Sequence, residues 1–148
     1  MSTDAMLRRV AAVAVLAAAP AHAAVRLEKG WSRPVPAGLS TGVGYGVLVN
    51  DGPAPVRLTG LSSPLAARVE MHESQRVAGP MGPMSHMAPL AGVTVPARGV
   101  VAFVPEGRHM MLVGLKRPLT AGASVPLTLT FAGAPPLRTT LAVRSTAP

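Results

Sequence analysis

Short runs in which apolar side chains occupy every second position constrain the fold of this 148-residue chain more than any other feature. The clearest run is VPLTLTF (125–131), and the segments 43–49 and 138–144 repeat the pattern. Successive side chains leave opposite faces of a β-strand, so this alternation predicts strands with one buried face. No stretch after residue 24 shows the sustained periodicity of an amphipathic helix.

Further strands are expected at residues 26–32, 55–61, 66–72, 92–95, 99–104 and 108–113, between turns rich in the chain's 15 glycines and 16 prolines. Seven to nine short strands of this kind predict a single all-β domain over residues 24–148, built as a Greek-key β-sandwich. The Gly/Pro-rich segment 76–86 follows no strand pattern, and we expect it to be a mobile loop.

The first 23 residues have the layout of a secretory signal peptide. Two arginines precede a short apolar run at 10–19, and the tripeptide AHA that ends at Ala23 is a small-x-small cleavage site. The run is shorter than the roughly 20 residues that span a bilayer. We therefore expect cleavage after Ala23, release into the periplasm and no membrane span in the mature protein. The chain contains no cysteine, which excludes a lipidated cysteine anchor and a disulfide framework.

The mature chain is strongly basic, since loss of Arg8, Arg9 and Asp4 leaves 12 basic and 5 acidic residues. The basic residues are scattered singly, and only four aromatic residues are available for base stacking. This pattern favours a positively charged surface suited to anionic partners or membrane faces over one that binds nucleic acid, which an exported protein rarely meets.

Every histidine and methionine of the mature chain lies between Met71 and Met111. His109 and Met111 are two residues apart, so on a strand they share one face, while Met110 and Leu112 are expected to point inward. Imidazole and thioether form a soft, neutral ligand set of the kind that suits Cu(I). The sequence therefore predicts a metal site on a β scaffold.

On the strand 66–72 the same alternation places Met71 on the core face and His72 on the other face. Glu70 and Glu73 flank His72 singly, and we expect both to be solvated. No nucleophile–base pair and no carboxylate pair accompanies the histidines, so an enzyme is not expected. An electron-transfer blue-copper site would need a cysteine. The alternative interpretation is a β-sandwich interaction module with a methionine-rich contact surface and no metal.

Several short sequence motifs are spread over almost the whole mature chain. They are WSR (31–33), Y-x4-N (45–50), VEMHES (69–74), VTVPARG (93–99), HMMLVGLKRPL (109–119) and VPLTLTF (125–131). With these segments the sequence resembles the periplasmic copper chaperones of the PCuAC (DUF461) type, whose pattern is H-x10-M-x21-H-x-M. The resemblance implies a cupredoxin-like β-sandwich that binds Cu(I).

By this resemblance the metal ligands are His72, Met87, His109 and Met111. Twenty-one residues separate Met87 from His109, as in the family, but fourteen separate His72 from Met87 where the family has ten. The four additional residues lie in the segment that also offers Met81, Met84 and His86 as alternative ligands. Met84, with eleven intervening residues after His72, remains open for the third position.

The resemblance also implies a role: supply of copper towards the CuA centre of cytochrome c oxidase, with subunit II or another periplasmic copper protein as the acceptor, or buffering of periplasmic copper. The C-terminal sequence LAVRSTAP offers no ligand for a second metal.

The signal-peptide interpretation predicts that the exported protein begins at Ala24. Mass spectrometry of the protein recovered from the periplasmic fraction should give the mass of residues 24–148. An intact N-terminus in the membrane fraction would contradict the assignment.

Overall fold

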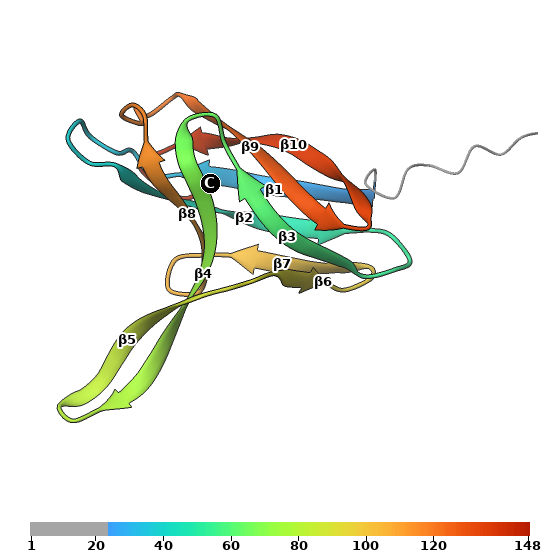
Figure 1. Cartoon of the computed structure of the whole chain (residues 1–148), viewed down its shortest axis with the longest axis horizontal. Helices are drawn as coiled ribbons and strands as arrows, with labels where there is room; N and C mark the ends of the chain where they lie inside the picture. The colour runs from blue at the N-terminus through green and yellow to red at the C-terminus, as the bar shows by residue number, and fades with distance from the viewer. Residues whose placement is uncertain (1–23) are drawn as a thin grey trace, which may run out of the picture.

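The computed structural model describes residues 24–148, and the expected signal peptide lies outside the described residues. Within this range the chain forms ten β-strands and no α-helix, as Figure 1 shows. The strands are β1 (Val25–Ser32), β2 (Thr41–Asn50), β3 (Val56–Ser62), β4 (Ala66–Gly79), β5 (Gly82–Pro89), β6 (Val93–Val95), β7 (Gly99–Phe103), β8 (Arg108–Leu115), β9 (Ser124–Ala132) and β10 (Ala134–Val143). The predicted all-β fold is confirmed.

Seven strands form a ring in the order β4-β8-β2-β1-β10-β9-β3, and a bridge between Leu61 and Val69 returns from β3 to β4. The β1–β10 pair is parallel, and the other pairs are antiparallel. The remaining strands extend the ring: β5 pairs with β4, β6 with β3, and β7 with β2. Sheets on opposite sides of the ring face each other across one core, which makes the fold a β-sandwich.

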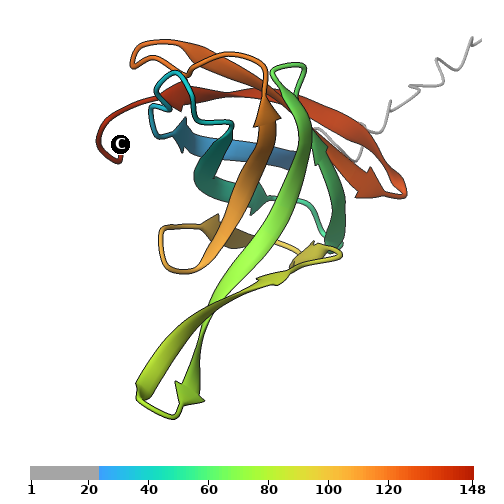
Figure 2. The ribbon, with the colours of Figure 1, turned by 60° about the vertical axis from the view of Figure 1, so that its left-hand side comes forward.

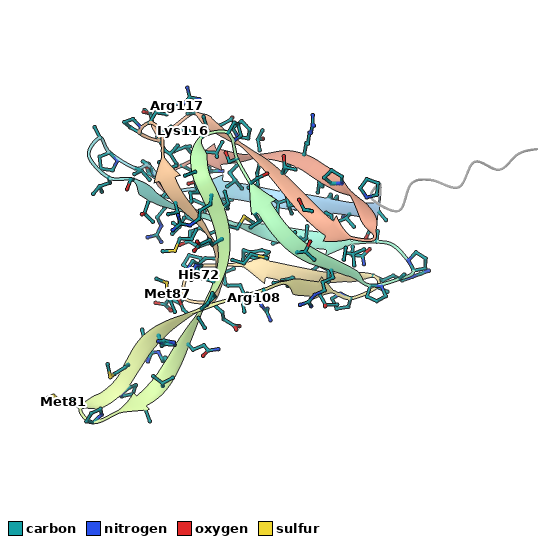
Figure 3. All side chains as sticks on the ribbon, viewed as in Figure 1. His72, Met81, Met87, Arg108, Lys116 and Arg117 are labelled. Carbon is teal, nitrogen blue, oxygen red and sulfur yellow. The ribbon has the colours of Figure 1, made fainter. Side chains whose placement is uncertain are left out.

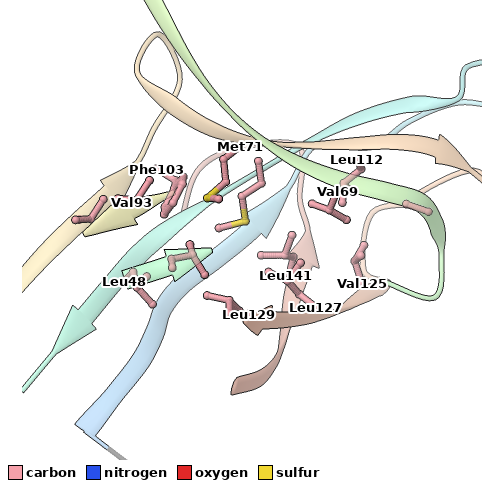
Figure 4. Close-up of a cluster of buried hydrophobic side chains, with 14 of the residues drawn as sticks. Leu48, Val69, Met71, Val93, Phe103, Leu112, Val125, Leu127, Leu129 and Leu141 are labelled. Atoms are coloured by element: carbon pink, nitrogen blue, oxygen red, sulfur yellow. The ribbon is translucent and has the colours of Figure 1, made fainter. Parts of the chain in front are cut away.

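The alternating runs supply the core. Leu48, Leu58, Leu129, Leu141 and Leu112 are completely buried, and each contributes about 1.5–3 kcal/mol through burial of its side chain. In Figure 4, Met71 lies beside Phe103 at one end of this core. Met71 is therefore a core residue, as its position on the strand predicts.

A long hairpin of β4 and β5 projects from the sandwich (Figure 2). The two strands pair from His72 and Pro89 outward to Gly79 and Gly82, although residues beyond Glu73 on β4 have no other partner strand. We refer to residues 75–87 as the arm; nearly all of its side chains are exposed.

The expectation of a loop at 76–86 is therefore wrong, because these residues form the two strands and the turn of the hairpin. Pro80 and Met81 form the two-residue turn of the hairpin, and Gly82 takes a φ of 110°, which glycine adopts without strain. Pro83 and Pro89 lack a backbone N–H, but β5 is an edge strand, where proline is tolerated.

Because the arm adds little to the core, we predict that shortening it leaves the sandwich stable. Replacing residues 77–84 by Asn-Gly joins Arg76 to Ser85, which face each other in register. The unfolding temperature should change by no more than roughly 4 °C, the shift that about 1 kcal/mol produces in a domain of this size. Leu129→Ala should instead cost about 2–5 kcal/mol. Thermal unfolding followed by circular dichroism compares the two, and equal losses would show that the arm supports the core.

Candidate metal centre

His72 and His109 stand directly opposite each other on β4 and β8. Their rings are nearly parallel, with 5.9 Å between centroids and 20° between planes. The neighbouring pair, Met71 with Met110, points into the core, and Met110 is fully buried. The inward direction expected for Met110 is confirmed, and the two histidines share the other face of the sheet.

Hydrogen bonds fix which ring nitrogen of each histidine is free. His109 donates Nδ1–H to the carbonyl oxygen of Gly107 at 3.1 Å, which leaves Nε2 with its lone pair. His72 donates Nε2–H to a carboxylate oxygen of Glu70 at 2.8 Å. Nδ1 of His72 is consequently an acceptor, and this buried atom has no hydrogen-bond partner. A metal ion would satisfy it.

The expectation that Glu70 is only solvated is incomplete, because its carboxylate takes part in hydrogen bonds beside His72. Glu70 accepts hydrogen bonds from His72 and from Arg68, and these bonds, that of His72 first, lower the pKa of the Glu70 carboxyl. Glu73 lies 3.9 Å from Arg108 in a partly exposed ion pair. A carboxylate that holds the second nitrogen of a ligating histidine fixes the orientation of its ring. The spacing Glu70-x-His72 already places both side chains on one face.

Met111 and Met87 flank the histidine pair on the same face. Met111 is opposite Glu70, and Met87 is opposite Ser74, so each is a diagonal cross-strand neighbour of His72. Met111 is partly buried, whereas 48% of the Met87 surface is exposed. In Figure 3, Met87 lies near His72 at the base of the arm. The register thus brings all four residues to one face of β5, β4 and β8.

The other candidate ligands lie elsewhere on the arm. Met84 and His86 are opposite Val77 and Gln75, which puts them on the face of the hairpin opposite to Met87. Met81 is fully exposed at the tip (Figure 3). The assignment of the third ligand stays a prediction, and the register favours Met87 over Met84.

Any metal site here would depend on methionine sulfur. Residues 24–148 contain no group of three or more His, Cys, Asp or Glu side chains arranged to hold a metal ion. Two imidazole nitrogens and two thioether sulfurs form a ligand set without formal charge, which favours a soft monovalent ion.

An aromatic pair continues the same face beyond Met111. Met111 is opposite Val43 on β2, and Tyr45, two residues further along, is opposite Trp31 on β1. The Trp31 and Tyr45 rings are 5.0 Å apart and buried, and the guanidinium carbon of Arg33 lies about 6 Å from each. The aromatic pair and Met111 therefore lie on the same face of the sheet.

A family model described as "Putative lipoprotein LpqE-like" matches residues 25–143. The chain belongs to this family. The LpqE-like chain is also 29% identical over 107 residues to "Putative lipoprotein Lxx21020" of Leifsonia xyli subsp. xyli, a match that covers 72% of this chain. The chain spans 61% of the length of that curated relative.

Solved structures of PCuAC domains share the fold. The copper-bound PCuAC domain of PmoF2 has a TM-score of 0.69 at 24% identity, covering 83% of this chain and 94% of that one. Apo-DR1885 of Deinococcus radiodurans is 28% identical with a TM-score of 0.61, covering 99% and 96%. Its Cu(I) form is 31% identical with a TM-score of 0.56, covering 80% and 78%. The resemblance to PCuAC proteins and the cupredoxin-like β-sandwich are thereby confirmed.

The names of the LpqE-like family and its curated relative point to exported proteins. Both names contain the word lipoprotein, yet this chain has no cysteine. Among residues 24–148, no helix has the length and apolar character needed to cross a bilayer.

The hydrogen-bond geometry predicts how Glu70 titrates. Because its pKa is lowered in the folded protein, these bonds stabilise the fold above the usual glutamate pKa of about 4.3. That contribution is lost as the pH falls through the lowered pKa. His72→Ala should raise the pKa of Glu70 more than Arg68→Ala does, since His72 is the larger cause. A pH titration of the carboxyl carbon by NMR measures both, and the reverse order would contradict the geometry.

Proposed function

We propose that this protein is a copper chaperone that binds Cu(I) on the face shared by His72, His109, Met111 and Met87. The observation that carries the proposal is the stacked histidine pair, with Nδ1 of His72 buried and free of any partner. The copper-bound PmoF2 domain and the Cu(I) form of DR1885 support copper as the metal.

Each ligand has its own part in the proposed site. Nε2 of His109 and Nδ1 of His72 supply two preoriented nitrogens, because their other nitrogens are held by Gly107 and Glu70. Met111 adds a thioether that the strand fixes relative to His109. Thioethers carry no proton, so competition from protons arises at the histidines alone.

Met87 suits a site that must release its ion. Its exposed side chain has to be ordered on binding, which costs up to about 2 kcal/mol of rotamer freedom. An acceptor can approach from this side and displace a methionine before the less exposed histidines. We therefore propose delivery as the role, with the CuA centre of cytochrome c oxidase subunit II or another periplasmic copper protein as the acceptor.

The location follows from the same proposal. Export with cleavage after Ala23 would place the protein in the periplasm, where a ligand set without cysteine avoids oxidation of thiols. The protein acts by binding and transfer, and no catalytic step is proposed.

Anaerobic Cu(I) competition against a chromophoric chelator tests the ligand set. We expect one tightly bound ion, weakened at least about 100-fold by His109→Ala or His72→Ala, since even loss of a group that orients a ligand costs 10–100-fold. Met87→Ala should weaken binding by about tenfold, the equivalent of 1.4 kcal/mol.

Met81→Ala serves as the matched control, because Met81 is fully exposed at the arm tip and should not affect the tight site. Equal losses from every methionine substitution would indicate a diffuse apolar contact surface without a defined metal site. Copper-dependent loading of a purified CuA domain then separates delivery from buffering.

A further inference from the structure

The arm carries a second group of soft donors that the proposed copper site does not use. Met84 and His86 are two residues apart on β5, so their side chains leave the same face of the hairpin. That face is opposite to the one that bears Met87. Met81 follows at the tip, which places three soft donors within six residues.

Met84 is directed along the arm towards this tip. Its Sδ lies 2.6 Å from the point where a Cβ on Gly79 would be, so the thioether crosses to β4 and occupies space that only glycine leaves free. Gly79 pairs with Gly82, next to Met81 in the turn. The Met84 side chain therefore extends towards the turn that contains Met81 and away from His86, and with 55% of its surface exposed it can be reoriented by an ion.

The scarcity of charged side chains on the arm also favours a soft ion over a hard one. Arg76 is the only charged residue in the segment 74–89, and it is opposite Ser85, on the face that bears Met87. Within residues 74–89 the face of Met84 and His86 carries no carboxylate; Glu73, on the same face at the base of the arm, is paired with Arg108. Positions two apart on a strand are about 6.6 Å apart, a span that methionine and histidine side chains can bridge through one ion.

We propose that Met84, His86 and Met81 form a second Cu(I) site, exposed on the arm and separate from the histidine pair. The site goes beyond the proposed function and does not require that the first site be occupied. Its donors are exposed and must be ordered by the ion, so it binds about 100-fold more weakly than the preoriented pair. An exposed weak site of this kind gives Cu(I) an entry point on the most accessible part of the molecule.

Titration with Ag(I), a redox-stable mimic of Cu(I), tests the second site by NMR of 13C-labelled methionine methyl groups. In the unaltered protein the first equivalent should shift Met87 and Met111, and the second should shift Met81 and Met84. The buried methyls of Met71 and Met110 serve as internal references. Simultaneous shifts of the four other methyls in one step would overturn the proposal.

Two variants separate this proposal from the first. His72→Ala/His109→Ala should still bind one equivalent at the arm, and loss of all binding would overturn the second site. Met84→Leu/His86→Ala should remove only the weaker equivalent, whereas a loss at the tight site as large as that of His109→Ala would also overturn it. Val77→Ala is the matched control, since Val77 is an exposed neighbour of Met84 without a donor.

The effects of Met84→Ala and Met87→Ala on the tight site should be additive, because the two residues lie on different faces; strong coupling would assign them to one site. If His109→Ala leaves the tight equivalent unchanged while arm binding persists, the proposed ligand set fails and the second site stands.

Discussion

The antiparallel pairing of β4 with β8 is the constraint on which both the fold and the candidate site depend. One cross-strand pair, Met71 with Met110, packs in the core, and the next pair, His72 with His109, forms the candidate site. A slip of one residue would bury imidazoles in the core and expose the methionines. The apolar core therefore sets the register that brings the histidines together, and no disulfide is needed to hold them.

In the candidate site the two histidine rings are held by hydrogen bonds, whereas Met87 is not. Backbone and carboxylate acceptors hold the two imidazoles before any ion arrives, at the cost of leaving Nδ1 of His72 buried without a partner. An unpaired buried acceptor costs about 1–3 kcal/mol, which binding of an ion would recover. Met87, in contrast, is about half exposed, and its side chain would be ordered by the ion. In the proposed site, affinity and exchange would therefore depend on different residues.

The sequence predicted the elements of this fold better than their connections. All nine expected strands are present, because alternating apolar residues report directly on burial; most ends are shifted by a few residues, and β4 extends seven residues beyond its expected end. The strand β5 was missed, since glycines, prolines and exposed methionines hide the alternation in a hairpin that packs against no core. Which strands are neighbours depends on contacts distant in the chain, so the ring could not be deduced from local patterns.

The candidate site, like the fold, could be predicted from the sequence only in part. The resemblance to the PCuAC pattern suggested four candidate ligands but left the choice between Met84 and Met87 open, because spacing does not say which face a residue occupies. Once the hairpin register is known, the odd separation between the two residues assigns them to opposite faces. Glu70 was undervalued because an isolated acid beside a histidine becomes informative only when both are known to lie on one strand.

The parallel pairing of β1 with β10 has a consequence for how the protein is made. It joins the first and last strands of the described chain, so the ring closes only after nearly every other residue has been synthesised. Folds dominated by such distant contacts form slowly, typically in milliseconds to seconds. A chain that still lacks β10 leaves one edge of β1 without its partner, so the ring stays open until the last strand is available.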